Sequence, residues 1–568
     1  MSRRTLMALL VLALVGLVMI CMPRNTLPIF RLAPPAVTAA SAVEAARALL
    51  QSTGPVSETS DRFILRSGPV RLEVYKTSGG VWAEDTTALW NPDLNPLLPD
   101  TAALRPTISR LLGREKTVVR PDARDTTYAS FEFTGFGATY VTTLDRGTHT
   151  KTTVQLDRQI NFAARVKTSS RRDAQAIPIA GGGGEFKVTF GDQGRVIGYS
   201  GVWREIVGVA KRERLIPRAV ADREFLQHLH GLTPRSFDAR LAYESAPAPL
   251  RQEYLRPVYI YSGTVLVGGE SVPLQEVTLP ATSDPTTEDP PAQRTESDPP
   301  LPGSTDAEVP DENASEPPGT PGGPWHEVGA SWLGAAGGLS DAKGNVKGLL
   351  DKLQADGWAV NFNWSDKDAW YQDWKDDRER WVDAADLVFY TGHASMNGWM
   401  LQDHEHATSA VPFMARDVTP EDVASSTGGM YGGQDLEWLV ISACGPLQDE
   451  ELSPGGGAAL DRWAPAFGGI HLMLGFGSVK FSSEAEGARF AELALEGKTL
   501  INAWFRTAEE FQPSTNHAQA PNGPTVWVGA MWAYKTGQSP YSDHLWGHGA
   551  VAKDSKEPTT YRILWSQT

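Results

Sequence analysis

Two side chains capable of nucleophilic chemistry follow predicted buried strands. The apolar run 387–391 leads through Gly392 into His393, and the run 436–443 leads into Cys444. If these strands are parallel neighbours, both side chains emerge at the same edge of the sheet. An imidazole beside a thiol favours the thiolate, which is the attacking species. The spacing therefore predicts a dyad in which Cys444 is the nucleophile and His393 the base.

Small residues flank both members of this dyad. Gly392 and Ala394 lie on either side of the histidine, and Ala443 and Gly445 on either side of the cysteine. Backbone N–H groups at such positions can hold a developing oxyanion, so we expect these four residues to form the substrate-binding edge. The alternative is structural, because a buried cysteine often only fills a core and a histidine after a strand often only caps a turn.

Metal and cofactor chemistry have weaker support. The chain has two cysteines, of which Cys21 lies in an N-terminal apolar run, so a disulfide framework and a multi-cysteine zinc site are excluded. Other possible ligands are four histidines and five acids that lack the usual ligand spacing, and we expect solvated loops and a charged helix face there. No metal and no cofactor is predicted. These residues are His404, His406, His544, His548, Asp366, Asp368, Asp373, Asp376 and Asp377.

The elements that must position the dyad are strands and helices in alternation. Over 325–568, apolar strands near 326–332, 358–364, 387–390, 436–441 and 470–476 are separated by helical patterns, the last two near 484–496 and 499–511. Alternation of this kind predicts an α/β domain with a mostly parallel sheet. The region 55–280 favours a mainly β (α+β) domain, with hairpins such as 186–199 and 258–279.

Charge divides the 568 residues into three parts. The net charge is +8 over 1–280, −9 over 281–324 and −15 over 325–568. The middle part holds eleven prolines and few large apolar side chains, which predicts a disordered linker between two domains. The acidic back part excludes a nucleic-acid partner, and the opposite charges predict docking of 55–280 on 325–568.

The first residues predict that the chain is anchored in a membrane. Arg3 and Arg4 precede an apolar run that ends at Met22, which predicts an anchor over 1–22 followed by a stalk over 23–54. We therefore expect a single-pass membrane protein whose bulk lies outside the cytoplasm. The alternative is secretion after cleavage near Val37-Thr-Ala39.

The dyad motifs also resemble those of a known family. A strand ending in Gly392-His393, a spacer of about fifty residues and a strand ending in Ser442-Ala443-Cys444 resemble the caspase-like cysteine peptidases, nearest the branch of CHAT domains, gingipains and separase. The likeness covers about 325–512. It implies a caspase-like three-layer sandwich, and it implies that Cys444 forms a thioester with a peptide or protein substrate. The family has glycine after the histidine, where this chain has Ala394.

The sequence therefore predicts a membrane-anchored hydrolase of peptide bonds. Two alternatives remain at this stage. Ala394 favours a caspase-like scaffold without activity, and the 15 tryptophans of 325–568 favour a glycan-binding protein that uses side chains such as Trp332 and Trp399.

Overall fold

The structure of the chain is a computed structural model. We call residues 26–282 the front half and residues 326–568 the back half. The structure describes 26–104, 106, 128–169, 175–229, 232–267, 270–282, 326–406, 415–424, 431–449, 459–513, 526–535 and 539–568. The predicted linker 281–324 lies outside the described residues from 283 onward.

Fourteen strands of the front half form the larger sheet. Their order is β13-β1-β15-β14-β10-β9-β11-β12-β5-β4-β3-β2, with β16 beside β15 and β6 beside β9. The predicted hairpins are present as β11–β12 and β15–β16. The helices α2 (Ala39–Leu50) and α4 (Arg218–His228) belong to the described part of this half. The strands are β1 (Thr26–Leu32), β2 (Val56–Glu58), β3 (Arg62–Ser67), β4 (Val70–Tyr75), β5 (Val81–Asp85), β6 (Ala129–Gly137), β9 (Arg158–Lys167), β10 (Ala176–Ala180), β11 (Glu185–Phe190), β12 (Val196–Gly201), β13 (Ile206–Arg214), β14 (Thr233–Glu244), β15 (Tyr254–Val267) and β16 (Glu270–Pro280).

Nine strands form the sheet that carries the predicted dyad, in the order β18-β17-β19-β23-β24-β25-β26-β7-β8. The first five pair in parallel, and the remaining pairings are antiparallel. A small third sheet, β20-β21-β22, lies beside it. These strands are β7 (Thr139–Asp145), β8 (Thr150–Gln155), β17 (Glu327–Trp332), β18 (Ala359–Ser365), β19 (Leu387–Thr391), β20 (Ala394–Ser395), β21 (Gly398–Gln402), β22 (Ala415–Val418), β23 (Trp438–Ser442), β24 (Leu472–Phe476), β25 (Trp527–Tyr534) and β26 (Thr560–Gln567).

The predicted fold class is wrong. The chain is mostly β, with 42% strand against 22% helix, and its large sheets are mixed or antiparallel. The prediction of a mostly parallel, caspase-like α/β sandwich is therefore withdrawn. Strand–helix alternation holds only as far as β24. After it, β25 and β26 return antiparallel, and β7 and β8 of the front half continue the same sheet.

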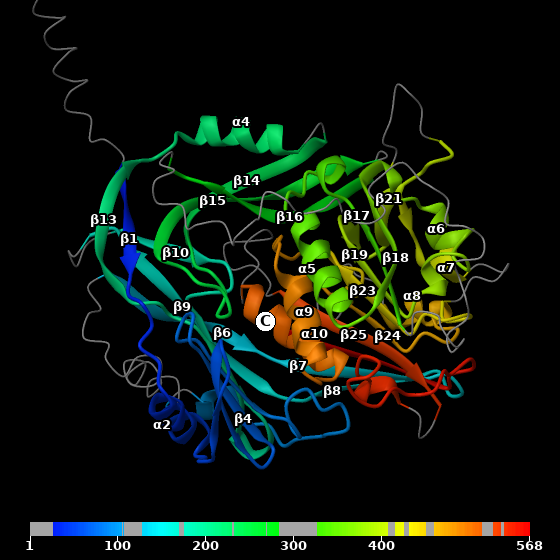
Figure 1. Ribbon diagram of the computed structural model, residues 1–568, viewed down its shortest axis with the longest axis horizontal. Coiled ribbons are helices and arrows are strands. Elements are labelled where there is room, and N and C mark those ends of the chain that lie inside the picture. Colours follow the sequence, from blue (N-terminus) through cyan, green and yellow to red (C-terminus); the bar gives the residue numbers. More distant parts are fainter. Residues whose placement is uncertain are drawn as a thin grey trace, which may run out of the picture.

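Helices cover both faces of the nine-stranded sheet. Figure 1 shows α5, α9 and α10 together beside the sheet, with α6, α7 and α8 at its other side. Side chains of β19 alternate between two separate cores, with Phe389 in one and Val388 in the other. The helices of the back half are α5 (Ala342–Ala355), α6 (Gln372–Lys375), α7 (Pro420–Ala424), α8 (Ala459–Trp463), α9 (Glu486–Leu495) and α10 (Leu500–Phe511).

The two halves share one of these cores. Trp90 of the front half packs edge-on against Phe505 of α10, with ring centroids 5.4 Å apart. Trp82 and Leu89 lie in the same apolar cluster as Trp504. The front half is therefore packed into the hydrophobic interior of the back half and not only against its surface.

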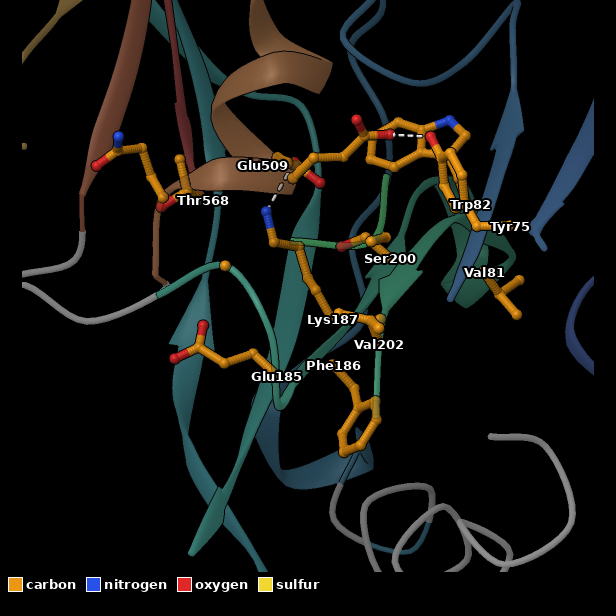
Figure 2. Close-up of a pocket in the computed structure, with 15 residues that line it drawn as sticks. Tyr75, Val81, Trp82, Glu185, Phe186, Lys187, Ser200, Val202, Glu509 and Thr568 are labelled. Atoms are coloured by element: carbon orange, nitrogen blue, oxygen red, sulfur yellow. Dashed lines mark hydrogen bonds and ion pairs between the residues drawn. The ribbon is translucent and has the colours of Figure 1, made fainter. Parts of the chain in front are cut away.

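Buried ion pairs reinforce this junction. The guanidinium of Arg506 on α10 donates one hydrogen bond to each carboxylate oxygen of Glu73 on β4, at 2.9 and 2.6 Å. Both side chains are 0% exposed. This fork holds the pKa of the Glu73 carboxyl well below its usual range against the opposing effect of burial. Close by, Lys187 of β11 reaches Glu509 of α10 at 2.7 Å, as Figure 2 shows. Each pair crosses between the halves.

The predicted single-pass membrane location is also wrong. None of the helices in the described residues has the length and apolar character needed to span a bilayer. The predicted anchor itself, 1–22, lies outside the described residues, which begin at 26. The single-pass localisation therefore has no support and we withdraw it.

The buried fork gives a stability prediction. Glu73→Gln removes the buried carboxylate that Arg506 shares with Arg62 and Arg71 and leaves Glu510 as the remaining carboxylate partner of Arg506, which should cost about 3 kcal/mol of unfolding free energy. Urea denaturation measures this cost. Glu58→Gln is the control, since its exposed pair with Lys76 should contribute less than about 1 kcal/mol. A loss in Glu73→Gln no larger than in the control would contradict this account of the junction.

Candidate functional site

The strand register places both members of the predicted dyad after neighbouring strands, and no hydrogen bond joins them in the described residues. In the parallel pair β19–β23, Thr391 lies opposite Ser442. His393 follows Thr391 by two residues, and Cys444 follows Ser442 by two, so the two residues leave neighbouring strands at the same edge. Parallel neighbours lie about 4.8 Å apart. Both residues are 0% exposed.

A backbone carbonyl sets the tautomer of His393. Its Nε2 lies 2.6 Å from the carbonyl oxygen of Gly337 in the loop after β17. A carbonyl only accepts, so Nε2 carries the proton and Nδ1 keeps a lone pair. Nδ1 is buried and has no hydrogen-bond partner in the described part of the chain. Burial lowers the pKa of His393 and the Gly337 carbonyl partly offsets this, so the imidazole rests neutral.

The thiol of Cys444 is neutral as well. Burial raises its pKa to about 12, although the backbone N–H and the charge of Lys480 act in the opposite direction. That N–H donates to Sγ at 3.4 Å. The Lys480 ammonium is itself held by the Ser442 hydroxyl at 3.0 Å and by the carboxylate of Glu486. The dyad is therefore an uncharged pair and no thiolate is present beforehand.

A cavity of about 230 Å³ adjoins the thiol. A larger cavity of about 600 Å³ shares Val272 and Asn397 with it and extends past β22 to Pro420 and Arg462. Together they form a path along the strand edge at which the dyad lies. The smaller cavity is lined by Ser271, Val272, Pro273, Ser395, Met396, Asn397, Cys444, Gly445, Gln448 and Val479.

Strand β16 of the front half closes one side of this path. Gln275 donates its side-chain amide to the carbonyl of Gly392 at 2.6 Å, in a fully buried contact. Glu276 donates its N–H to the carbonyl of Lys480 at 3.2 Å and accepts from the N–H of Ser482 at 3.1 Å. The strand is thereby fixed to the residues on both sides of the dyad.

The four small residues have different roles. Gly392 must be glycine, because a Cβ there would lie 2.2 Å from the Tyr390 hydroxyl. Gly445 has a left-handed φ of 74°, and its N–H donates to the carbonyl of Ser478 at 3.0 Å, so that N–H is engaged. Ala394 is buried in β20 opposite Trp399. Ala443, also buried, immediately precedes the cysteine.

Sequence reasoning missed three residues of the site. Gln275 lies far from the dyad in sequence, and only the long-range fold brings it to Gly392. Gly337 lies in a glycine-rich loop after β17, and its role depends on a backbone carbonyl, which residue type does not reveal. Lys480 carried a usable signal, since it is a single charge in the stretch Val479-Lys480-Phe481.

The histidines considered as metal ligands are dispersed. His406 contacts Asp403 at 2.9 Å, His404 stacks on Trp370, and His548 contacts Asp356 at 2.8 Å. Among the acids, Asp366 accepts two loop N–H groups, from Gly334 and Ala336. Each has a local structural partner.

A different acidic group is compact enough to consider. Asp386, Asp435 and Glu437, which we call the carboxylate cluster, have oxygen atoms within 4.8 Å of one another. The cluster lies where β19 and β23 begin, at the opposite end of these strands from the dyad. Burial raises the pKa of Asp386 to about 7, of Asp435 to about 6 and of Glu437 to about 10. The charge of Asp435 adds to the shifts of Asp386 and Glu437, and the charge of Asp554 adds to the shift of Asp435.

Comparisons with known proteins name no activity. A family model described as a domain of unknown function (DUF6345) matches residues 327–568, which include both members of the dyad. A comparison with curated proteins finds no match. Among solved structures, the chain is similar to an uncharacterized protein from Eubacterium rectale at 11% identity and a TM-score of 0.25, over 47% of this chain and 85% of that one. A likeness this low carries no argument.

The carboxylate cluster predicts a pH-dependent effect on stability. Its folded pKa values lie above the unfolded values near 4, so the folded state holds extra protons. Stability therefore falls as pH rises from about 4 to about 6–7 for Asp435 and Asp386, and up to about 10 for Glu437. Asp435→Asn removes one repelling charge. It should stabilise the protein by about 1 kcal/mol at pH 8 and have little effect at pH 4.5, as measured by urea denaturation. Glu405→Gln is the exposed control. An equal effect of Asp435→Asn at both pH values would contradict this assignment.

Proposed function

We propose that the chain is a cysteine hydrolase of peptide bonds that rests in a closed state. The observation that carries the proposal is that a buried thiol and a buried imidazole follow neighbouring strands, and that the imidazole keeps an Nδ1 lone pair without a hydrogen-bond partner in the described residues. The β19–β23 register supports it, because it requires the two residues to leave adjacent strands at one edge.

The chemistry begins with a proton transfer. His393 Nδ1 takes the proton of the Cys444 thiol as Sγ bonds to the substrate carbonyl carbon, and the carbonyl π electrons move onto oxygen. Collapse of this intermediate breaks the C–N bond, and the proton on Nδ1 goes to the leaving amine. A water molecule then gives its proton to Nδ1 and attacks the thioester, which returns the acid product and the thiol.

Two features match this role for His393. Its Nε2–H bond to the Gly337 carbonyl keeps the ring in the tautomer that the transfer needs, and it also stabilises the imidazolium that forms. Because the thiol has a pKa of about 12, base assistance is required at neutral pH. A dyad that stays neutral until substrate arrives meets that requirement.

The likeness of these motifs to those of caspase-like peptidases supports this chemistry. It does not extend to the fold of the chain. It concerns the residues around His393 and Cys444, and the fold of the chain as a whole is mostly β. The substrate remains a peptide or protein by this proposal.

The closed state is the second part of the proposal. A fully buried thiol is out of reach of a substrate until some part of its cover moves. β16 lines the cavity beside Cys444 and belongs to the front half. We propose that docking of the front half on the back half restrains the site, and that displacement of β16 opens the path to the thiol.

A scaffold without activity is the second candidate. It is favoured by the Gly445 N–H, which already bonds Ser478 and so is not free for an oxyanion. The glycan-binding alternative loses the tryptophans on which it was based, because Trp332 and Trp399 are 8% and 0% exposed.

Peptide cleavage separates the hydrolase from the scaffold. The full chain, as wild type and as the opened variant Gln275→Ala, is incubated with a mixed-sequence synthetic peptide library, and products are measured by mass spectrometry. Cleavage should disappear in Cys444→Ala and slow by about 10²–10⁴-fold in His393→Ala. His404→Ala is the control histidine and should leave the rate unchanged. Cleavage by neither form, or cleavage that persists in Cys444→Ala, would establish that the hydrolase assignment is wrong.

Thiol accessibility tests the restraint by β16. In a Cys21→Ser background Cys444 is the single thiol. Gln275→Ala removes one buried hydrogen bond, worth about 1 kcal/mol, so opening and alkylation by iodoacetamide should become about 5-fold faster. Gln227→Ala on the exposed face of α4 is the matched control. If both variants react at the wild-type rate, β16 does not gate the thiol.

A further inference from the structure

A separate cavity of about 490 Å³ lies where the two large sheets meet, away from the dyad. It is formed by the end of β6, by β7 and β8, by the start of β9, by the start of β25 and by the end of β26. Its volume falls within the range of about 300–1,000 Å³ that is typical of small-molecule sites. We call it the ring cavity. Its lining residues are Thr101, Phe136, Gly137, Ala138, Tyr140, Thr153, Gln155, Arg158, Trp527 and Gln567.

Three aromatic rings form the apolar part of the ring cavity. Phe136 is 38% exposed, which is unusual for so large an apolar side chain, and it packs on Phe133 at 5.1 Å between centroids. Tyr140 and Trp527 have centroids 6.1 Å apart. Such faces bind the C–H side of a sugar or the plane of another ring, because both are apolar and flat.

A cation without a hydrogen-bond partner among the described residues lies beside these rings. In the described residues no hydrogen bond or ion pair holds the guanidinium of Arg158, and its Nε is buried without a partner. The exposed carboxylate of Asp100 feels the Arg158 charge only through space. A half-buried guanidinium without a partner is costly, and a carboxylate would satisfy it with two parallel hydrogen bonds.

Further polar groups complete the site. The Tyr140 hydroxyl also has no hydrogen bond to any described residue, and burial raises its pKa, so it remains a donor. The Gln155 side-chain amide donates to the Asp157 carbonyl, and the Gln567 side-chain oxygen accepts from the Ala138 N–H. Arg158 and Tyr140 therefore offer donors to the cavity, as does the amide N–H of Gln567, and these groups select an acceptor-rich ligand.

We propose that the ring cavity binds a ring-shaped ligand bearing a carboxylate, and specifically a uronic acid unit. The carboxylate would pair with Arg158, the ring face would lie on the exposed face of Phe136, and a ring hydroxyl would accept from Tyr140. This role is independent of the dyad, since the cavity shares no residue with either cavity at the thiol.

Ligand-detected saturation-transfer NMR on the full chain tests the proposal, with titration for affinity. The probes are sodium D-glucuronate, a trigalacturonate and neutral D-glucose. Saturable binding of a uronate, at least 10-fold tighter than glucose, is expected. Tighter binding of the trimer would indicate that the natural ligand is part of a polysaccharide. Equal binding of both uronates would indicate that it is a free acid.

Matched variants locate the binding. Arg158→Gln should weaken uronate binding at least 10-fold, and Phe136→Ala should weaken glucose and uronate alike. Arg165→Gln on the same strand, exposed and paired with Glu132, should leave binding unchanged. Unchanged urea midpoints confirm that the variants fold. The proposal is overturned if uronate does not saturate, if glucose binds equally well, or if Arg158→Gln binds like wild type.

Discussion

The parallel register of two buried strands is the constraint on which the proposed chemistry depends. Thr391 pairs with Ser442, so His393 and Cys444 leave neighbouring strands at the same edge, two residues beyond this pair. A shift of one residue would move the side chains of one strand to the opposite face of the sheet and separate the dyad. The register is well determined, because both strands are fully buried and their alternate side chains fill two different cores.

The burial that determines the strand register also keeps both side chains of the dyad uncharged and shields the thiol from solvent. Removing the thiol from water raises its pKa to about 12, and burial lowers the pKa of the imidazole. The front half adds β16 as a cover and is held in place by the Arg506–Glu73 fork and by the shared aromatic core. Access to the thiol is thereby coupled to how the two halves pack, since the cover belongs to one half and the nucleophile to the other.

The sequence was informative where interactions are local. Apolar runs ending in His393 and Cys444 predicted both strands, and hairpin patterns predicted β11–β12 and β15–β16. It was misleading where distant segments decide the outcome. β7 and β8 join a sheet whose other strands lie about 200 residues later or more, which turned a predicted parallel α/β domain into a mixed sheet. Gln275 and the Arg158 cavity are likewise products of long-range pairing, and no periodicity in the sequence marks them.

The most direct test is to look for the acyl group on Cys444. The full chain carrying Gln275→Ala is mixed with a p-nitrophenyl ester of an N-acetylated amino acid, and intact-protein mass spectrometry follows the mass of the chain. The account predicts a transient gain equal to one acyl group, mapped to Cys444, absent in Cys444→Ala and strongly slowed in His393→Ala. No gain in mass, or the same gain in all three proteins, would contradict the nucleophilic role of this thiol.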